Sequence, residues 1–90
     1  MSETLTEKQV DELIKEINSK NLVLYNDDVN TFELVIFCLM KYCKHELTQA
    51  EQCTMVVHNK GKCKIKSGSF DDLKPIHEAL SRHQLTVEIE

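Results

Sequence analysis

The chain has 90 residues, of which 41% are hydrophobic and 29% are charged, as in ordinary globular domains. This length supports one domain with one core. The net charge of −4 disfavours nucleic acid and anionic membranes as partners, because both are negatively charged. No stretch approaches the length of a transmembrane helix, and the N-terminus lacks the apolar core of a secretory signal. The sequence therefore predicts a cytoplasmic protein.

Four cysteines are present, and in the cytoplasm we expect them to be reduced thiols. They are Cys38, Cys43, Cys53 and Cys63. All four fall within apolar patterns, where a free cysteine behaves as a small hydrophobic residue. A zinc site favours paired short spacings, whereas Cys38 and Cys43 stand five residues apart on a predicted helix and do not share a face. We therefore expect neither a metal nor a cofactor.

The first part of the chain is polar, but it contains one helical stripe. The apolar residues of this stripe are Val10, Leu13, Ile14 and Ile17. Thr6 and Gln9 have the spacing of a helix cap. The helix either rests on the domain or is marginal, because isolated helices this short are weak in water. We predict that residues 1–20 form a flexible or marginally helical N-terminal extension and that residues 21–90 form the core domain.

The stretch from residue 22 to residue 33 predicts a strand, a polar turn and a helix start. Its first four residues, Leu-Val-Leu-Tyr, indicate a short buried strand. Three polar residues follow: Asn26, Asp27 and Asp28. Asn30 precedes Glu33 by the spacing of a capping box, so a helix is expected from there to about Lys44. The turn either binds a cation or is simply solvated.

A second helix and a second strand are expected next. Thr48 and Glu51 have capping-box spacing and predict a helix through about Asn59. Gly61 is placed to end that helix with a positive φ. Residues 62–66 alternate between lysines and apolar residues, which is typical of a half-exposed strand.

The last part of the chain predicts a third core helix and a third strand. Because Pro75 cannot lie deep inside a helix, we expect a loose turn over residues 70–73 and a regular helix from near Pro75. Residues 85–89 alternate and predict the final strand. The predicted fold class is α+β: a β-α-α-β-α-β two-layer sandwich with a small three-stranded antiparallel sheet, helices on one face and an N-terminal extension.

His58 differs from the other histidines because it lies at the C-terminal end of a predicted helix, where the helix dipole favours a proton. It is either structural or, if that end reaches the Asn26 turn, an imidazole beside two carboxylates. An Asp27–His58 pair suits general acid–base chemistry. However, the sequence has only two glycines and contains neither a nucleophile elbow nor a phosphate loop. The sequence thus favours binding over catalysis, and we assign no catalytic residue.

Two segments together resemble the ClpS family, the adaptor of the bacterial Clp protease. They are Leu-Val-Leu-Tyr-Asn-Asp-Asp-Val-Asn-Thr-Phe-Glu-Leu-Val at residues 22–35 and Val-Val-His-Asn-Lys-Gly-Lys at residues 56–62. The resemblance covers residues 21–90 and implies the same element order. It also implies a non-enzymatic adaptor that binds N-degrons, which are proteins beginning with Phe, Leu, Tyr or Trp. The adaptor would deliver them to the N-terminal domain of a Clp AAA+ unfoldase such as ClpA.

The resemblance also implies roles for individual residues. The α-amino group of the substrate would be held by Asn26, Asp27 and His58, with Asp28 and Asn30 in support. The hydrophobic side-chain pocket would be lined by Phe32, Val35, Thr54, Val57 and Leu85. Two alternatives remain open: a general protein-interaction module of ribosomal-stalk-like fold without N-terminal specificity, and a small hydrolase that uses Asp27 and His58.

Overall fold

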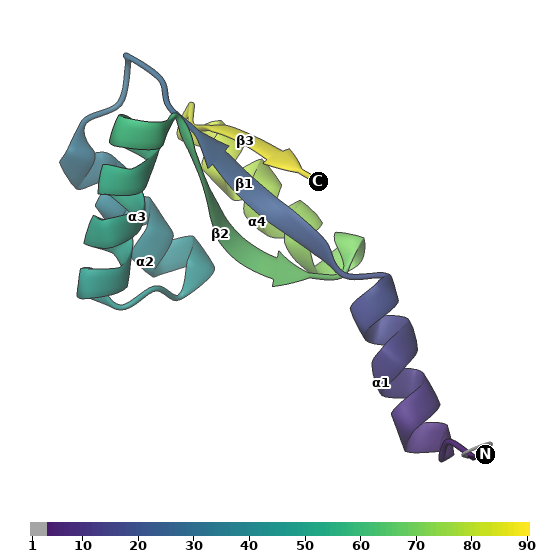
Figure 1. Ribbon diagram of the computed structural model, residues 1–90. Coiled ribbons are helices and arrows are strands. Elements are labelled where there is room, and N and C mark those ends of the chain that lie inside the picture. Colours follow the sequence, from purple (N-terminus) through teal and green to yellow (C-terminus); the bar gives the residue numbers. More distant parts are fainter. Residues whose placement is uncertain (1–3) are drawn as a thin grey trace.

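The computed structural model describes residues 4–90 and contains four helices and three strands within them (Figure 1). In chain order they are α1 (Glu7–Ile17), β1 (Lys20–Tyr25), α2 (Phe32–Cys43), α3 (Leu47–Lys60), β2 (Lys62–Gly68), α4 (Phe70–Arg82) and β3 (Thr86–Ile89). The order after α1 is β-α-α-β-α-β, so the predicted α+β fold class is confirmed.

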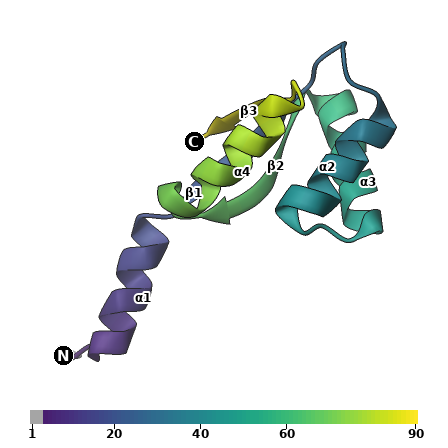
Figure 2. The same cartoon turned by 180° about the vertical axis from the view of Figure 1, so that it is seen from behind.

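β1 is the central strand of an antiparallel sheet with the order β2-β1-β3. Leu24 lies opposite Cys63 of β2 and Val87 of β3, and the register with β2 shifts between Leu22 and Val23. Strand side chains alternate between the two faces of a sheet. On one face Leu22, Leu24 and Val87 join the buried cluster that also contains residues of α2, α3 and α4. Figure 2 shows α4 lying across the strands.

The predicted caps of α2 and α3 were wrong by one or two residues. Thr31, and not Asn30, caps α2, because its side-chain oxygen accepts a hydrogen bond from the Leu34 amide at 3.2 Å. Asn30 is unavailable because its own side chain is bonded elsewhere. α3 begins at Leu47 without a side-chain cap, so Thr48 already lies inside the helix.

The loose turn expected before Pro75 was also wrong. α4 is helical from Phe70, and Ser69 caps it by accepting a hydrogen bond from the Asp72 amide at 3.1 Å. A proline inside a helix removes the hydrogen bond to the carbonyl four residues earlier. Here that carbonyl belongs to Asp71, and both residues are exposed, so water can take the place of the missing amide.

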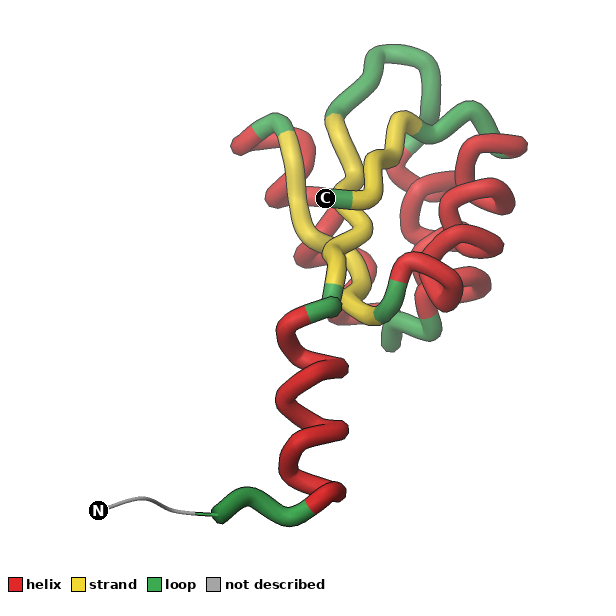
Figure 3. The backbone as a smooth tube through the Cα atoms, turned by 90° about the vertical axis from the view of Figure 1, so that its right-hand side faces the viewer, coloured by secondary structure: helices red, strands yellow, loops and turns green. Residues whose placement is uncertain are grey.

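α1 forms as the helical stripe predicted, but it contributes nothing to the core. Thr6 and Gln9 form both halves of a capping box, at 3.1 and 2.9 Å, as their spacing predicted. None of the residues of α1 is buried, and Figure 3 shows the helix projecting away from the rest of the chain. The division into residues 1–20 and 21–90 stays a prediction, and residues 1–3 lie outside the described part. Over residues 4–90, every helix is too short or too polar to cross a bilayer.

Candidate functional site

A cavity of about 240 Å³ lies where the end of β1, the following loop, the start of α2 and the C-terminal half of α3 meet. Its lining residues are Leu24, Tyr25, Asn26, Asp27, Asp28, Asn30, Phe32, Val35, Thr54, Val57 and His58. The structure therefore brings together every residue suggested for the site except Leu85. Two lining residues, Leu24 and Tyr25, were not suggested, although they directly precede the polar turn.

The structure places Leu85 in the core and not on the cavity. Leu85 is 4% exposed and belongs to the main buried cluster. The preceding residue, Gln84, has a φ of 64°, and the Leu85 amide donates to the Leu80 carbonyl at 3.1 Å. This tight turn at the end of α4 brings Leu85 into the core, so its contribution to the cavity is indirect.

Asp27 organises the loop between β1 and α2. One oxygen of its carboxylate, Oδ1, accepts hydrogen bonds from the backbone amides of Val29 at 2.8 Å and Asn30 at 2.9 Å. The Asn30 side-chain amide lies 3.2 Å from each oxygen of the same carboxylate. Asp27 thus forms an Asx-type turn. Its second oxygen, Oδ2, receives only the Asn30 side chain and retains capacity for another donor.

The same contacts set the charge of Asp27. Partial burial acts to raise the pKa of this carboxyl group, but the hydrogen bonds from the Asn30 and Val29 amides and the Asn30 side chain outweigh it, and the pKa is lowered. The group is therefore a carboxylate at neutral pH. It is an acceptor of hydrogen bonds and attracts cations.

Two longer-range hydrogen bonds fix the loop to other parts of the fold. The Asn26 amide donates to the Gly61 carbonyl at 2.9 Å, which joins the loop to the end of α3. Gly61 has a φ of 92°, as expected for the residue that ends this helix. The Asn30 side chain donates to the Gln84 carbonyl at 2.9 Å, which joins the loop to the turn before β3.

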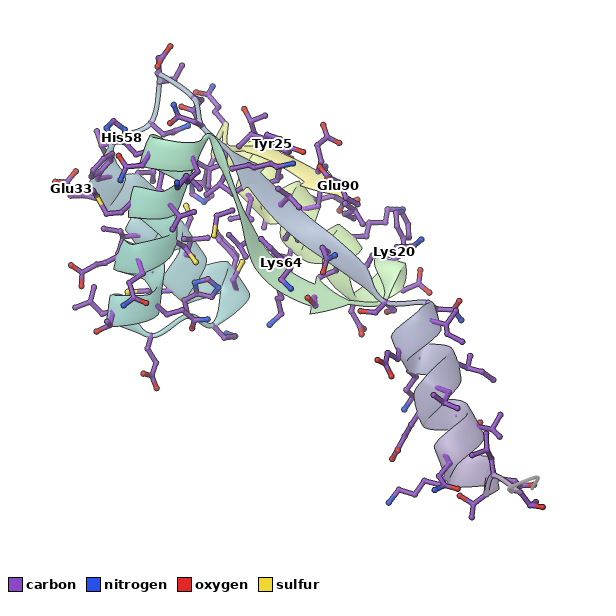
Figure 4. The ribbon with its side chains drawn as sticks, in the orientation of Figure 1. Lys20, Tyr25, Glu33, His58, Lys64 and Glu90 are labelled. Carbon is purple, nitrogen blue, oxygen red and sulfur yellow. The ribbon has the colours of Figure 1, made fainter. Side chains whose placement is uncertain are left out.

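The opposite side of the cavity is apolar and comes from α2 and α3. Phe32 and His58 face each other edge to face, with ring centroids 5.1 Å apart and planes at 74°. Thr54 and Val57 are buried. The Thr54 hydroxyl donates to the Ala50 carbonyl at 2.8 Å within α3, so it needs no partner in the cavity. Figure 4 shows His58 and Glu33 at the same end of the α2–α3 pair.

The cavity therefore combines hydrogen-bond acceptors with an apolar wall. The side chains of Asn26, Asp27 and His58 each offer an acceptor atom, if the imidazole is neutral. Phe32 and Val57 offer apolar surface next to them. Across residues 4–90, no three His, Cys, Asp or Glu side chains are grouped so that they can hold a metal ion. Such a site suits an organic ligand that carries an ammonium beside a bulky apolar group.

The fold and cavity define a small α+β binding module. The family model described as "ATP-dependent Clp protease adaptor protein ClpS" matches residues 15–88. The chain therefore belongs to the ClpS family of Clp protease adaptors.

Curated relatives agree with this assignment. The ClpS adapter of Thermosynechococcus vestitus is 39% identical over 71 residues, which cover 78% of this chain and 74% of that protein. The ClpS adapter of Sodalis glossinidius is 31% identical over 75 residues, covering 81% of this chain and 71% of that protein. Human E3 ubiquitin-protein ligase UBR1 is 30% identical over 74 residues, but this match spans only 4% of UBR1.

A solved structure shares the fold. It is Agrobacterium tumefaciens ClpS2 bound to L-phenylalaninamide, with a TM-score of 0.70 and 18% sequence identity. The similarity covers 81% of this chain and 95% of that one.

Proposed function

We propose that this chain is a cytoplasmic, non-enzymatic adaptor that binds proteins by a bulky hydrophobic first residue, Phe, Leu, Tyr or Trp. It would deliver them to the N-terminal domain of a Clp AAA+ unfoldase for degradation. The observation that carries the proposal is the cavity, in which the acceptors of Asn26, Asp27 and His58 adjoin the apolar wall at Phe32 and Val57. The ligand of the related ClpS2, L-phenylalaninamide, has two features that complement such a cavity: an α-amino group and a bulky side chain.

The polar end of the cavity suits a free α-amino group. Such a group has a pKa of about 8 and is mostly charged at neutral pH. Its ammonium has three donors, and an amide oxygen, a carboxylate and a neutral imidazole nitrogen can accept one each. Charge-assisted hydrogen bonds contribute about 1.5–3 kcal/mol apiece. Asp27 is well suited because the turn that it forms already fixes its position.

The apolar part of the cavity suits one side chain. The whole cavity, polar end included, has a volume of about 240 Å³, which is below the range of about 300–1,000 Å³ that is typical of sites for drug-sized ligands. Full burial of a Phe or Leu side chain contributes about 1.5–3 kcal/mol. Ordering the peptide offsets part of the total, so we expect micromolar affinity.

The hydrolase alternative has less support. Thr54 is the one hydroxyl-bearing aliphatic side chain among the lining residues, and it is bonded to the Ala50 carbonyl. The lowered pKa of Asp27 makes it a weak base, whereas an efficient general base has a pKa near the working pH. Both observations favour binding.

The test is a titration with a peptide that begins Phe-Arg and with the same peptide acetylated at its N-terminus. We expect acetylation to weaken binding by at least about 100-fold, because it removes the charge and donors of the ammonium. A Gly-Arg peptide controls for the side chain and is expected to bind weakly. Equal affinity for the free and acetylated peptides would favour a general interaction module without N-terminal specificity. Capture of the Clp unfoldase N-terminal domain by the full chain tests delivery separately.

A further inference from the structure

The apolar wall of the cavity contains one buried residue with a polar side chain, Thr54 of α3. Thr54 is 4% exposed, and its neighbour in the wall, Val57, is also buried. Phe32 and His58 line the same cavity but are exposed. The two exposed rings therefore form the rim of the cavity, and Thr54 and Val57 form its inner end.

The Thr54 side chain presents an acceptor, and not a donor, at this inner end. Within residues 4–90, its side-chain oxygen Oγ1 makes one hydrogen bond, to the Ala50 carbonyl at 2.8 Å. A carbonyl oxygen only accepts, so the hydroxyl proton of Thr54 is held by that bond and cannot be donated to a ligand. A hydroxyl oxygen can accept hydrogen bonds as well as donate one. The acceptor capacity of Oγ1 thus stays available to a ligand that carries a donor.

The spacing between the rim and the inner end matches the length of one aromatic side chain. Thr54 precedes His58 by four residues, so the two side chains share a face of α3 and lie about 6 Å apart along its axis. His58 is one of the groups proposed to hold the α-amino group, together with Asn26 and Asp27 at the same polar end. A tyrosine ring and its para hydroxyl span a similar length, which brings the hydroxyl to the level of Thr54.

We propose that Thr54 selects tyrosine as the preferred first residue of the substrate, because its Oγ1 accepts a hydrogen bond from the tyrosine hydroxyl. This inference rests on the proposed function and narrows its substrate class from bulky hydrophobic first residues to tyrosine. Phenylalanine has the same ring but no donor, so it fills the same space and leaves the Thr54 acceptor unpaired. A site that bonds a substrate hydroxyl discriminates against the analogue that lacks it.

The burial of Thr54 strengthens this discrimination. A side chain that fills the cavity excludes water from an oxygen that is already nearly inaccessible, so water competes little for the acceptor. A hydrogen bond is electrostatically stronger in such surroundings than in water. The other acceptors of the cavity, on Asn26 and Asp27, lie at the polar end and are occupied by the ammonium of the bound substrate.

The test is a calorimetric titration of the full chain with two peptides that differ only in beginning with Tyr-Arg or Phe-Arg. We expect the Tyr peptide to bind about 2- to 10-fold more tightly, as for one net hydrogen bond. A Tyr peptide that binds no more tightly than the Phe peptide would overturn this inference and leave the proposed function standing. Failure of both peptides to bind would overturn the proposed function and this inference together.

A third peptide separates the hydrogen bond from the size of the side chain. It begins with para-fluorophenylalanine, whose fluorine is close in size to the tyrosine oxygen but cannot donate. We expect it to bind like the Phe peptide. If it bound as tightly as the Tyr peptide, the preference would come from filling space, and the role of the Thr54 acceptor would be refuted.

Variants of the wild-type chain assign the acceptor to Thr54, with the Tyr-to-Phe affinity ratio as the readout. Thr54→Val replaces the hydroxyl with a methyl group, so the ratio is expected to fall to one or below, because the tyrosine hydroxyl loses its acceptor. Thr54→Ser keeps the oxygen and is expected to retain the preference. Thr48→Val makes the matched change at an exposed position of α3 outside the cavity and should leave the ratio as it is. An undiminished ratio in Thr54→Val would overturn the assignment.

Discussion

Exposed apolar side chains occur both at the cavity and on α1, but their surroundings differ. At the cavity, Phe32 is 42% exposed but lies against His58 above a wall of buried residues. On α1, Ile17 is 77% exposed, and none of the residues of that helix is buried. Figure 3 shows α1 projecting away from the domain formed by the other elements.

The two regions differ in how firmly the backbone around the apolar side chains is held. The cavity is held from three sides: Asp27 fixes its own turn, Asn26 bonds to Gly61, and Asn30 bonds to Gln84. α1 has only its local capping box at Thr6. A preorganised frame lowers the ordering cost of binding, whereas a lone helix offers surface without a fixed geometry.

The largest expected effect is on the stability of the core that supports the cavity. Leu39 is fully buried in α2, within the core cluster. Leu39→Ala is expected to lower the free energy of unfolding by about 2–5 kcal/mol, through lost burial and the cavity left behind. Urea denaturation measures this loss. A change below about 1 kcal/mol would contradict the assignment of α2 to the central core.

The second prediction separates the charge of Asp27 from its role in the turn. Asp27→Asn keeps a side-chain oxygen for the Val29 and Asn30 amides but removes the charge. We expect affinity for a peptide beginning with Phe to fall by about 10- to 100-fold, as for one lost charge-assisted hydrogen bond. Calorimetry measures the affinity, and a melting curve checks the fold. Unchanged affinity would remove Asp27 from the ammonium site.

The third prediction concerns the turn and its pH dependence. Asp27→Ala is expected to lower the free energy of unfolding at pH 7 by about 0.5–2 kcal/mol, as for loss of a helix-capping side chain. Because the pKa of Asp27 is lower in the folded state, its contribution is present above its ordinary value of 3.8 and is lost as the pH falls through the folded value. The wild type and the variant should therefore converge in acid denaturation. If the difference in free energy of unfolding between the wild type and Asp27→Ala grew as the pH fell, the pKa of Asp27 would be raised on folding and not lowered.

A smaller effect is expected from Phe32 at the rim of the cavity. Phe32→Ala removes the edge-to-face contact with His58 and part of the apolar wall. A contact between Phe32 and a bound aromatic side chain would contribute about 0.5–1.5 kcal/mol, so affinity for a Phe peptide is expected to fall about 2- to 10-fold. Phe32→Leu, which keeps most of the apolar surface, is the matched control. Tighter binding by Phe32→Ala would indicate that Phe32 obstructs the cavity.

The smallest effect is expected on α1. Ile17→Ala is expected to change the free energy of unfolding by less than about 0.5 kcal/mol, because Ile17 is exposed and lies outside the core cluster. Peptide affinity is expected to stay the same. A loss comparable to that of Leu39→Ala would show that α1 packs on the domain in solution.

The sequence predicted the order of elements because the apolar periodicities are strong and local. It did not predict where α2, α3 and α4 begin. Asn30 looked like a cap, but a carbonyl at Gln84, far along the chain, takes its side chain. Pro75 looked like a boundary, but it is exposed and water can replace the bond that it removes.

The candidate site was predictable to the extent that its residues lie in two short segments. Those segments supplied Asn26, Asp27 and His58, and the fold brings them to one cavity. Leu85 does not line the cavity, because it follows the left-handed residue Gln84 and turns into the core, and Gln84 carries no strong sequence signal for that conformation.

The most direct test of the central claim is a two-by-two binding cycle. One axis replaces the α-amino group of a Phe-initiated peptide with a hydroxyl group, and the other replaces Asp27 with Asn. If Asp27 holds the ammonium, the hydroxyl replacement weakens binding to the wild type much more than binding to Asp27→Asn, because the charge pair is already broken in the variant. Equal losses on the two backgrounds would contradict the account.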